Sequence, residues 1–160
     1  EASVTSKDWV SNMKISTKGI YGIEAMLDLA IYSKGGVESL KNIAERRDIS
    51  EKYLEQIIGA LRKSGLVISI RGAGGGYQLA KTPEEITVLE ILQSVETTLI
   101  PMECLEESAE CGNNSKKCAV RLFWKRVWEE IEGVAGNATL KDLMVESEKY
   151  INSGTIEYYI

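Results

Sequence analysis

Apolar residues recur every three or four positions in the first part of the chain, which is the rhythm of helices with one buried face. The first such stripe consists of Ile20, Ile23, Met26, Leu27, Ala30 and Ile31. It predicts a helix from Ser16 or Thr17 to Ser33, which Gly35 and Gly36 end. Two shorter helices are predicted over about 39–48 and 51–64, with Ser50 as a cap. A short turn without proline joins them, as in helix-turn-helix architecture.

The pattern changes from helical to β-like after Gly65, where 66–70 and 77–80 predict the two strands of a hairpin. The tip between them, 71–76, is too rich in glycine for anything but a loop. It runs into a strand rather than a helix, which disfavours a nucleotide-phosphate cradle. A hairpin that follows a helix-turn-helix is typical of a DNA-binding wing, and an ordinary flexible hairpin is the alternative.

The second half of the chain predicts a short amphipathic helix over 86–95, a longest helix over about 117–134, and a further short helix that begins at 139–144. The longest helix carries a wide apolar stripe, namely Val120, Phe123, Trp124, Val127, Trp128, Ile131 and Val134. Because the winged part already closes its own core, we expect this stripe to meet a second subunit in a homodimer. A long core helix of a monomer is the alternative.

These elements predict a mainly α fold with a small β-hairpin wing. We expect an extension or expression remnant over 1–12, a winged helix-turn-helix domain over 13–98 and a cysteine-rich loop over 99–118. A dimerisation helix with a following short helix would occupy 119–150, and 151–160 would be a C-terminal tail.

Charge is unevenly divided along the chain. The net charge is −5 at pH 7, yet 13–81 hold eleven Lys and Arg against seven Asp and Glu, and 82–160 hold seven against fifteen. A basic half joined to an acidic half indicates local contact with nucleic acid. No apolar run is long enough to span a membrane, and the N-terminus lacks the apolar core of a secretory signal, so we expect a cytoplasmic protein.

Three cysteines, Cys104, Cys111 and Cys118, are separated by six residues each in a polar stretch with turn-forming residues at 112–115. An odd number excludes a complete disulfide framework. An iron–sulfur cluster, zinc, a thiol redox switch and inert surface cysteines remain as alternatives, although zinc normally takes four ligands and the chain has no histidine. The same lack of histidine removes the usual base of a nucleophilic enzyme, so we expect no catalytic activity.

The residues expected to contact double-stranded DNA follow from helix-turn-helix geometry, in which the second helix enters the major groove with its N-terminal end. They are Glu51, Lys52, Glu55 and Gln56 on that helix, Arg71, Gly72, Ala73 and Gly74 in the wing, and Lys18 and Lys63. Of these, we expect Lys18, Lys52 and Lys63 to contact phosphates. Gln56 can pair with adenine, and Glu55 can accept from the cytosine amino group. Each lysine could equally be a plain solvated side chain.

Four segments carry a resemblance to a known family: 13–23, 49–57, 61–67 and 71–77. They are similar to the opening, recognition helix and wing of the Rrf-two family of winged helix-turn-helix transcription regulators. With the three cysteines, the chain resembles the IscR-like branch of iron–sulfur cluster regulators. The resemblance implies a [2Fe–2S] cluster on the three cysteines and control of cluster-biogenesis genes. A nitric-oxide or redox-responsive regulator of the same family, and a small iron–sulfur electron-transfer protein, are the alternatives.

The fourth cluster ligand departs from that pattern. Where IscR-like proteins usually have a histidine, this chain has Arg121, which is a poor ligand. Relatives that use a carboxylate near the start of the first helix would place it close to Ile20, which cannot ligate. Glu24 and Asp28, one and two turns further along, are therefore the candidates, and solvated charges on an exposed helix face are the alternative. A glutamate of the cysteine-rich loop, water or a small thiol could also complete the site.

Overall fold

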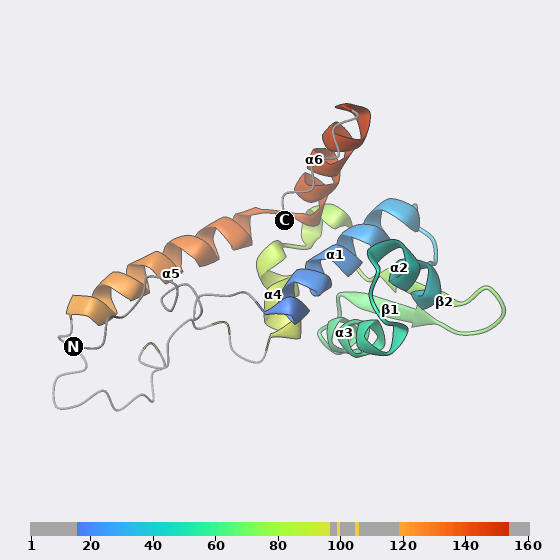
Figure 1. Cartoon of the computed structure of the whole chain (residues 1–160), viewed down its shortest axis with the longest axis horizontal. Helices are drawn as coiled ribbons and strands as arrows, with labels where there is room; N and C mark the ends of the chain where they lie inside the picture. Colours follow the sequence, from blue (N-terminus) through green and yellow to red (C-terminus); the bar gives the residue numbers. More distant parts are fainter. Residues whose placement is uncertain (1–15, 97–98, 100–104, 106–118, 154–160) are drawn as a thin grey trace, which may run out of the picture.

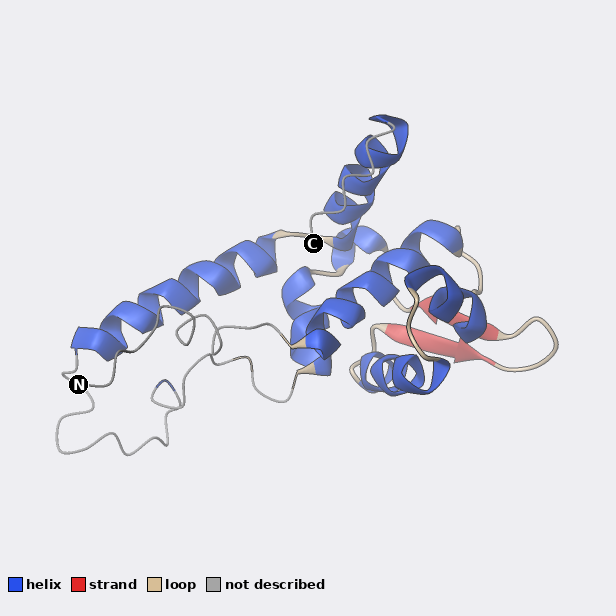
Figure 2. Ribbon diagram, in the orientation of Figure 1, coloured by secondary structure: helices blue, strands red, loops and turns tan. Residues whose placement is uncertain are grey.

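The computed structural model describes residues 16–96, 99, 105 and 119–153. Its elements are α1 (Thr17–Tyr32), α2 (Leu40–Arg47), α3 (Glu51–Lys63), β1 (Val67–Ile70), β2 (Gly76–Leu79), the 3-10 helix η2 (Pro83–Glu85), α4 (Val88–Val95), α5 (Ala119–Asn137) and α6 (Leu140–Ser153). The described chain is mainly helical with one antiparallel hairpin (Figure 2), which confirms the predicted fold class.

Serine caps fix where the first three helices begin. The hydroxyl oxygens of Ser16, Ser39 and Ser50 each accept a hydrogen bond from the backbone N–H three residues on, at 3.1–3.3 Å. Such a cap typically stabilises a helix by about 1 kcal/mol. At the other end, α2 stops because Asp48 adopts the left-handed conformation, with φ at 51°. The sequence prediction of these three helices is therefore confirmed to within one or two residues.

The wing is a hairpin tied to the rest of the domain by a third backbone segment. β1 pairs with β2 in the register Val67↔Leu79 to Ile70↔Gly76. On the far edge of β2, the backbone N–H groups of Glu38 and Tyr77 donate to each other's carbonyl oxygens at 2.9 and 2.8 Å. The linker between α1 and α2 thus pairs with the wing, which fixes the wing relative to the helix-turn-helix.

The core lies where α1, α3 and α4 meet, with the start of α6 packed against it. Its fully buried large side chains include Met26, Leu29, Leu54, Ile57, Ile91 and Leu140. The predicted stripe on α1 is correct at Met26 and Ala30 but wrong at Ile20, which is 47% exposed. Ile20 lies in the first turn of α1, where the neighbouring Gly19 is buried in its place.

Two helices at the C-terminal end extend beyond this core. Figure 1 shows α5 reaching away from the winged domain, with the 71–75 loop at the opposite end of the molecule. The base of α5 is held by two backbone hydrogen bonds, from Val88 N–H to the Ala138 carbonyl and from Leu140 N–H to the Ile86 carbonyl. α6 runs to Ser153, so the helix predicted as short is longer and takes in the first residues of the predicted tail.

Candidate nucleic-acid interface and cysteine segment

One face of α3 is buried and the other is free for recognition. Leu54, Ile57, Ile58 and Leu61 anchor the helix in the core. Glu51, Lys52, Glu55 and Gln56 are all exposed on its N-terminal half. This separation fixes the helix through its apolar side chains and leaves the residues predicted to contact DNA accessible, as major-groove recognition requires.

The glycines of the wing tip serve two different purposes. Gly72 and Gly74 have φ values of 109° and 81°, which side chains rarely adopt, and the space around both is open. Gly75 and Gly76 instead allow close packing, because a Cβ there would collide with the carbonyl oxygens of Ile70 and Glu38. The tip, with Arg71 and Ala73 exposed beside these glycines, is a tight loop that can come close to another molecule.

A buried ion-pair network connects α1 to α2. The Asp28 side chain is completely buried, and its carboxylate accepts hydrogen bonds from Arg46 Nη2 at 2.7 Å and Arg47 Nε at 3.0 Å. Arg46 also donates through Nε, and its guanidinium stacks 4.2 Å from the centre of the Tyr32 ring. Asp28, the second candidate cluster ligand, is therefore already held by two arginines. Because it is buried, it is also not a solvated charge on an exposed helix face. Removing this carboxylate would leave both arginines without their ion-pair partner and would lower the stability of the folded protein.

Glu38 extends this network toward the wing. Its carboxylate pairs with Arg46 Nη2 at 3.0 Å and accepts from Asn42 Nδ2 and the Ser39 backbone N–H. Burial raises the pKa of Glu38, but the hydrogen bonds from Asn42 and Ser39 and the nearby Arg46 outweigh it, so the pKa lies below its ordinary value. Hydrogen bonding to Asp28 raises the pKa of Arg46, which therefore keeps its charge. Because the Glu38 backbone also pairs with Tyr77, the network links α1, α2 and the wing.

The cysteine segment joins α4 to α5, and Cys104, Cys111 and Cys118 lie outside the described residues. At its start, the Ser16 hydroxyl donates to the Glu96 carboxylate, so the beginning of α1 and the end of α4 are joined. Glu24 is half-buried and has no hydrogen-bond or ion-pair partner in the described part of the chain. Within residues 16–96 and 119–153, no three Cys, Asp or Glu side chains come together as a metal site.

Three thiols fit an iron–sulfur cluster by chemistry, but they supply only three of the usual four ligands. Asp28 is not available as the fourth, because its oxygens are held by two arginines. Glu24 keeps the carboxylate that ligation needs. Of the two carboxylates expected from the sequence, Glu24 is therefore the one that the described contacts leave free to complete such a site.

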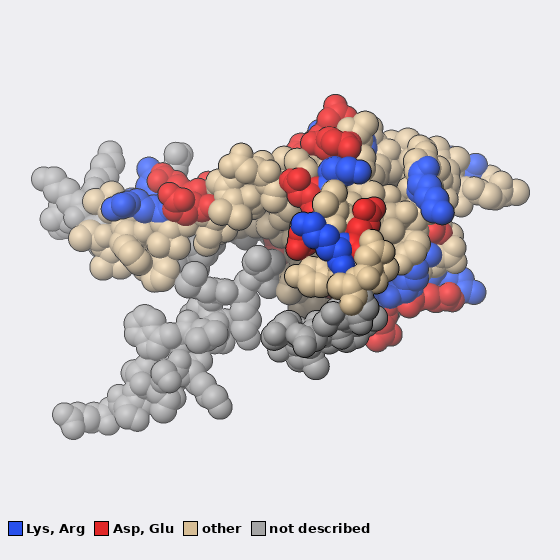
Figure 3. Space-filling view, turned by 90° about the horizontal axis from the view of Figure 1, so that it is seen from above, with Lys and Arg blue, Asp and Glu red and all other residues tan. Residues whose placement is uncertain are grey.

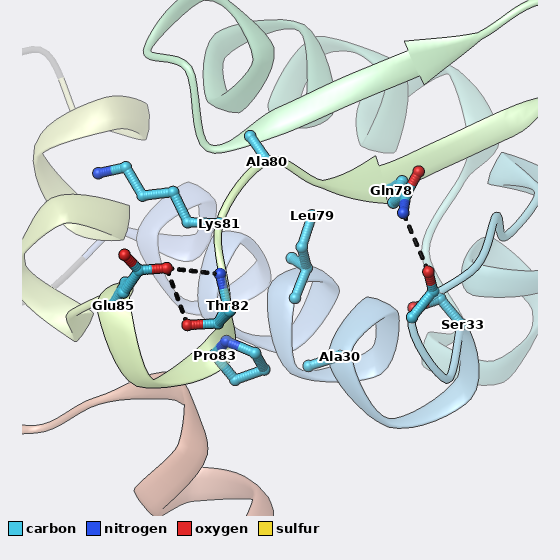
Figure 4. Close-up of a pocket in the computed structure, with 10 residues that line it drawn as sticks. Ala30, Ser33, Gln78, Leu79, Ala80, Lys81, Thr82, Pro83 and Glu85 are labelled. Atoms are coloured by element: carbon cyan, nitrogen blue, oxygen red, sulfur yellow. Dashed lines mark hydrogen bonds between the residues drawn. The ribbon is translucent and has the colours of Figure 1, made fainter.

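A hollow of about 410 Å³ lies between the end of α1, β2 and η2 (Figure 4), but four of its polar side chains are already engaged with other groups of the domain. The Glu85 carboxylate accepts from the Thr82 N–H and hydroxyl at 3.1 and 2.8 Å. Gln78 Nε2 donates to the Gly35 carbonyl, and Lys81 pairs with Glu90. These contacts make the hollow part of the framework that holds β2 to α1.

Charged side chains of both signs are interspersed on the face shown in Figure 3. Lys63 is exposed at the end of α3, and Lys18 is half-buried near the start of α1. Sequence reasoning missed Arg62, which is exposed in the last turn of α3 beside Lys63. The signal that could have found it was the Arg-Lys pair directly before the turn into β1.

No helix in the described part of the chain combines the length and the apolar character that crossing a membrane requires. The individual DNA contacts, the cysteine ligands and the domain limits expected from the sequence stay predictions.

Comparison with known proteins identifies the family. A family model described as "Rrf2: Iron-dependent Transcriptional regulator" matches residues 15–146. The HTH-type transcriptional regulator CymR of Bacillus subtilis is 43% identical over 131 residues, which cover 82% of this chain and 89% of that protein. The HTH-type transcriptional regulator IscR of Serratia proteamaculans is 39% identical over 132 residues, which cover 82% of this chain and 79% of that one.

Solved structures agree with these matches. The structure of T. potens IscR superimposes with a TM-score of 0.70 at 42% identity and covers 86% of this chain and 90% of that one. CymR (YrzC), the global cysteine regulator of B. subtilis, also gives a TM-score of 0.70, at 41% identity, and covers 84% of this chain and 98% of that one. The resemblance predicted from the recognition helix and wing is thereby confirmed. The chain belongs to the Rrf2 (Rrf-two) family of winged helix-turn-helix transcription regulators, which bind DNA and are not enzymes.

Proposed function

We propose that this protein is a homodimeric transcription regulator that senses iron–sulfur cluster status and controls genes of cluster biogenesis. The observation that carries the proposal is the set of Cys104, Cys111 and Cys118 in the segment between α4 and α5. Three thiols at regular spacing in a polar stretch are suited to binding a cluster. The family description "Iron-dependent" and the IscR relatives support the same reading.

The proposed roles of the residues follow from this arrangement. The three cysteines would hold the cluster, for which the IscR-like resemblance implies the [2Fe–2S] type, and Glu24 is the described carboxylate that stays available to it. When bound, the cluster supplies a centre whose presence or charge depends on iron, oxygen or nitric oxide. Ser16 and Glu96 connect the start of the cysteine segment to α1, and α5 begins where that segment ends. A change in ligation would thus act on both the DNA-binding domain and α5.

The homodimer rests on the exposure of α5. Val120, Phe123 and Val134 are 61%, 58% and 72% exposed, although they belong to one apolar stripe. Among the described residues of this helix, only Ala135 is buried. A stripe of this kind is suited to covering by the same helix of a second copy, and helix-turn-helix proteins commonly bind paired half-sites as dimers.

A second candidate function is favoured by the CymR relatives, which match as closely as the IscR relatives do. In this alternative the protein responds to cysteine supply, and its thiols hold no cluster. A nitric-oxide or redox-responsive regulator is a variant of the first proposal, in which the cluster reacts with the signal.

Anaerobic reconstitution with iron and sulfide tests the proposal, with Cys111→Ala as the control. We expect a visible absorption band and stoichiometric iron and sulfide in the wild-type protein, and the loss of both in the variant. Duplex DNA binding would then be compared between the apo and cluster-loaded forms. A colourless wild-type protein that still binds DNA would contradict cluster sensing and favour the cysteine-responsive alternative.

A further inference from the structure

We propose that an open groove between the end of α3 and the edge of β1 binds phosphates of the DNA backbone. The groove has a volume of about 550 Å³ and is lined by Arg62, Gly65, Val67, Ile68, Ser69 and Arg71. Its donors are the guanidinium groups of Arg62 and Arg71 and the backbone N–H of Ser69. This inference rests on the DNA binding that the family implies, and it adds a contact surface between the recognition helix and the wing tip.

The two arginines are unneutralised within the described part of the chain. Arg62 and Arg71 are exposed, and neither has an ion-pair or hydrogen-bond partner among the described residues. Arg46 and Arg47 differ from them, since both are held by the Asp28 carboxylate. Among the described residues, no acidic side chain lines the groove. Two guanidinium groups without a counter-ion favour an anionic partner, and their planar donor forks match phosphate oxygens.

The backbone of β1 supplies a further donor. Ala80 N–H donates to the Leu66 carbonyl, and Tyr77 N–H donates to Glu38 on the other side of β2. Hydrogen bonding alternates along an antiparallel pair, so the N–H groups of Ile68 and Ile70 face β2, and the N–H of Ser69 points to the free edge. Ser69 is exposed, and this edge borders the groove. Backbone N–H groups are common donors to DNA phosphates.

The position of the groove is the one at which a phosphate backbone would lie. In the proposed complex α3 enters the major groove, and the wing tip approaches the adjacent minor groove. A sugar-phosphate strand separates the two grooves of a duplex. Because β1 leads from the end of α3 to the wing tip, its free edge would pass beside that strand.

An added β-strand from another polypeptide is the competing occupant, since a free strand edge can pair with one. Ile68 and Ile70 are 42% and 41% exposed, which would suit such a partner. Two arginines at the rim, with no carboxylate among the described lining residues, favour phosphate instead.

The first test is Arg62→Gln, measured as fluorescence anisotropy with a pool of random-sequence DNA duplexes over a range of salt concentrations. We expect affinity to fall about tenfold at moderate salt. The slope of log K against log salt should become less steep by about 0.9 for each phosphate that the variant no longer neutralises. Arg62→Lys, which keeps the charge, should retain the slope. Lys141→Gln, which removes an exposed charge on α6, should leave both quantities unchanged.

The second test separates the backbone donor from the side chain at position 69. Ser69→Pro removes an N–H that faces the free edge and takes no part in the β1–β2 ladder. Ser69→Ala keeps that N–H. We expect the proline variant to bind the duplex pool several-fold more weakly than the alanine variant, with equal thermal unfolding temperatures showing that both are folded.

Unchanged affinity and salt slope in Arg62→Gln would overturn the phosphate groove while leaving DNA binding by the wild-type protein intact. Loss of self-association in Ser69→Pro, with DNA binding unchanged, would overturn it in favour of strand addition. Failure of the wild-type protein to bind any duplex would overturn both this inference and the function on which it rests.

Discussion

Asp28 shows how much of this domain depends on a single carboxylate. Among the described residues, Asp28 is the one charged side chain that is fully buried. It joins α1 to both arginines at the end of α2. Arg46 passes the connection to Glu38, whose backbone pairs with the wing. Changing one residue of α1 should therefore affect the helix-turn-helix and the wing together.

We expect Asp28→Asn to destabilise the protein by about 2–3 kcal/mol in chemical denaturation, because it leaves two cations beside a neutral amide. This loss of stability lies at or below the low end of what breaking a fully buried ion pair usually costs. The reason is that the Arg46 side chain is 29% exposed and the Arg47 side chain is 25% exposed, so water partly solvates both charges. Glu146→Gln is the control, because the Lys149–Glu146 pair is exposed, and its loss should cost less than about 0.5 kcal/mol. Equal effects of the two substitutions would contradict a structural role for the network.

Gly76 is the second position at which one residue has a large effect. We expect Gly76→Ala to destabilise the protein by about 1–3 kcal/mol, because its Cβ would collide with the Glu38 carbonyl that pairs with Tyr77. Gly133→Ala is the matched control in α5, where nothing lies within 4 Å of the added methyl group and alanine favours the helix. In thermal unfolding, the unfolding temperature should fall for Gly76→Ala and rise for Gly133→Ala. An unchanged unfolding temperature for Gly76→Ala would mean that the Glu38 segment can move away from the added methyl group.

At the scale of the element, α3 has one face that is buried in the core and one exposed face that carries the residues predicted to contact DNA. We expect Gln56→Ala to relax base preference at one position of a selected DNA site by about 1–3 kcal/mol. Lys63→Ala should weaken binding to all sequences alike, because phosphates carry no base information. Selection from a random DNA library, with each variant compared to wild type, measures both effects. A uniform loss for Gln56→Ala would show that this side chain contacts the backbone instead of a base.

The elements themselves could be predicted because their signals are local. Ser16, Ser39 and Ser50 mark helix starts, and the glycine-rich tip marks the wing. The network around Asp28 could not be found in the same way, because Arg46 lies 18 residues away and an aspartate in a helix looks exposed by pattern. The free edge of β1 also depends on pairing between distant segments. The extent of α6 was underestimated, since its C-terminal half carries exposed residues such as Tyr150 that no core pattern reveals.

At the scale of the whole molecule, α5 carries an apolar stripe that is exposed outside the core at Val120, Phe123 and Val134. We expect Phe123→Asp to shift the protein from dimer to monomer in analytical ultracentrifugation, because it puts a charge into the proposed interface. Lys125→Ala, on the same helix but with an exposed and charged side chain, is the control. A dimer that survives Phe123→Asp at low protein concentration would place the interface elsewhere.

The attachment of α5 has a consequence for the DNA that such a dimer could use. Backbone hydrogen bonds hold both sides of the α5–α6 junction to the start of α4, so α5 has little freedom to swing at its base. Two recognition helices carried on such rigid arms would be held at one separation and one rotational phase. Inserting a single base pair between the half-sites turns one of them around the duplex axis, away from its helix. The spacer length of the operator would then be selected as strictly as its bases, although no side chain touches it.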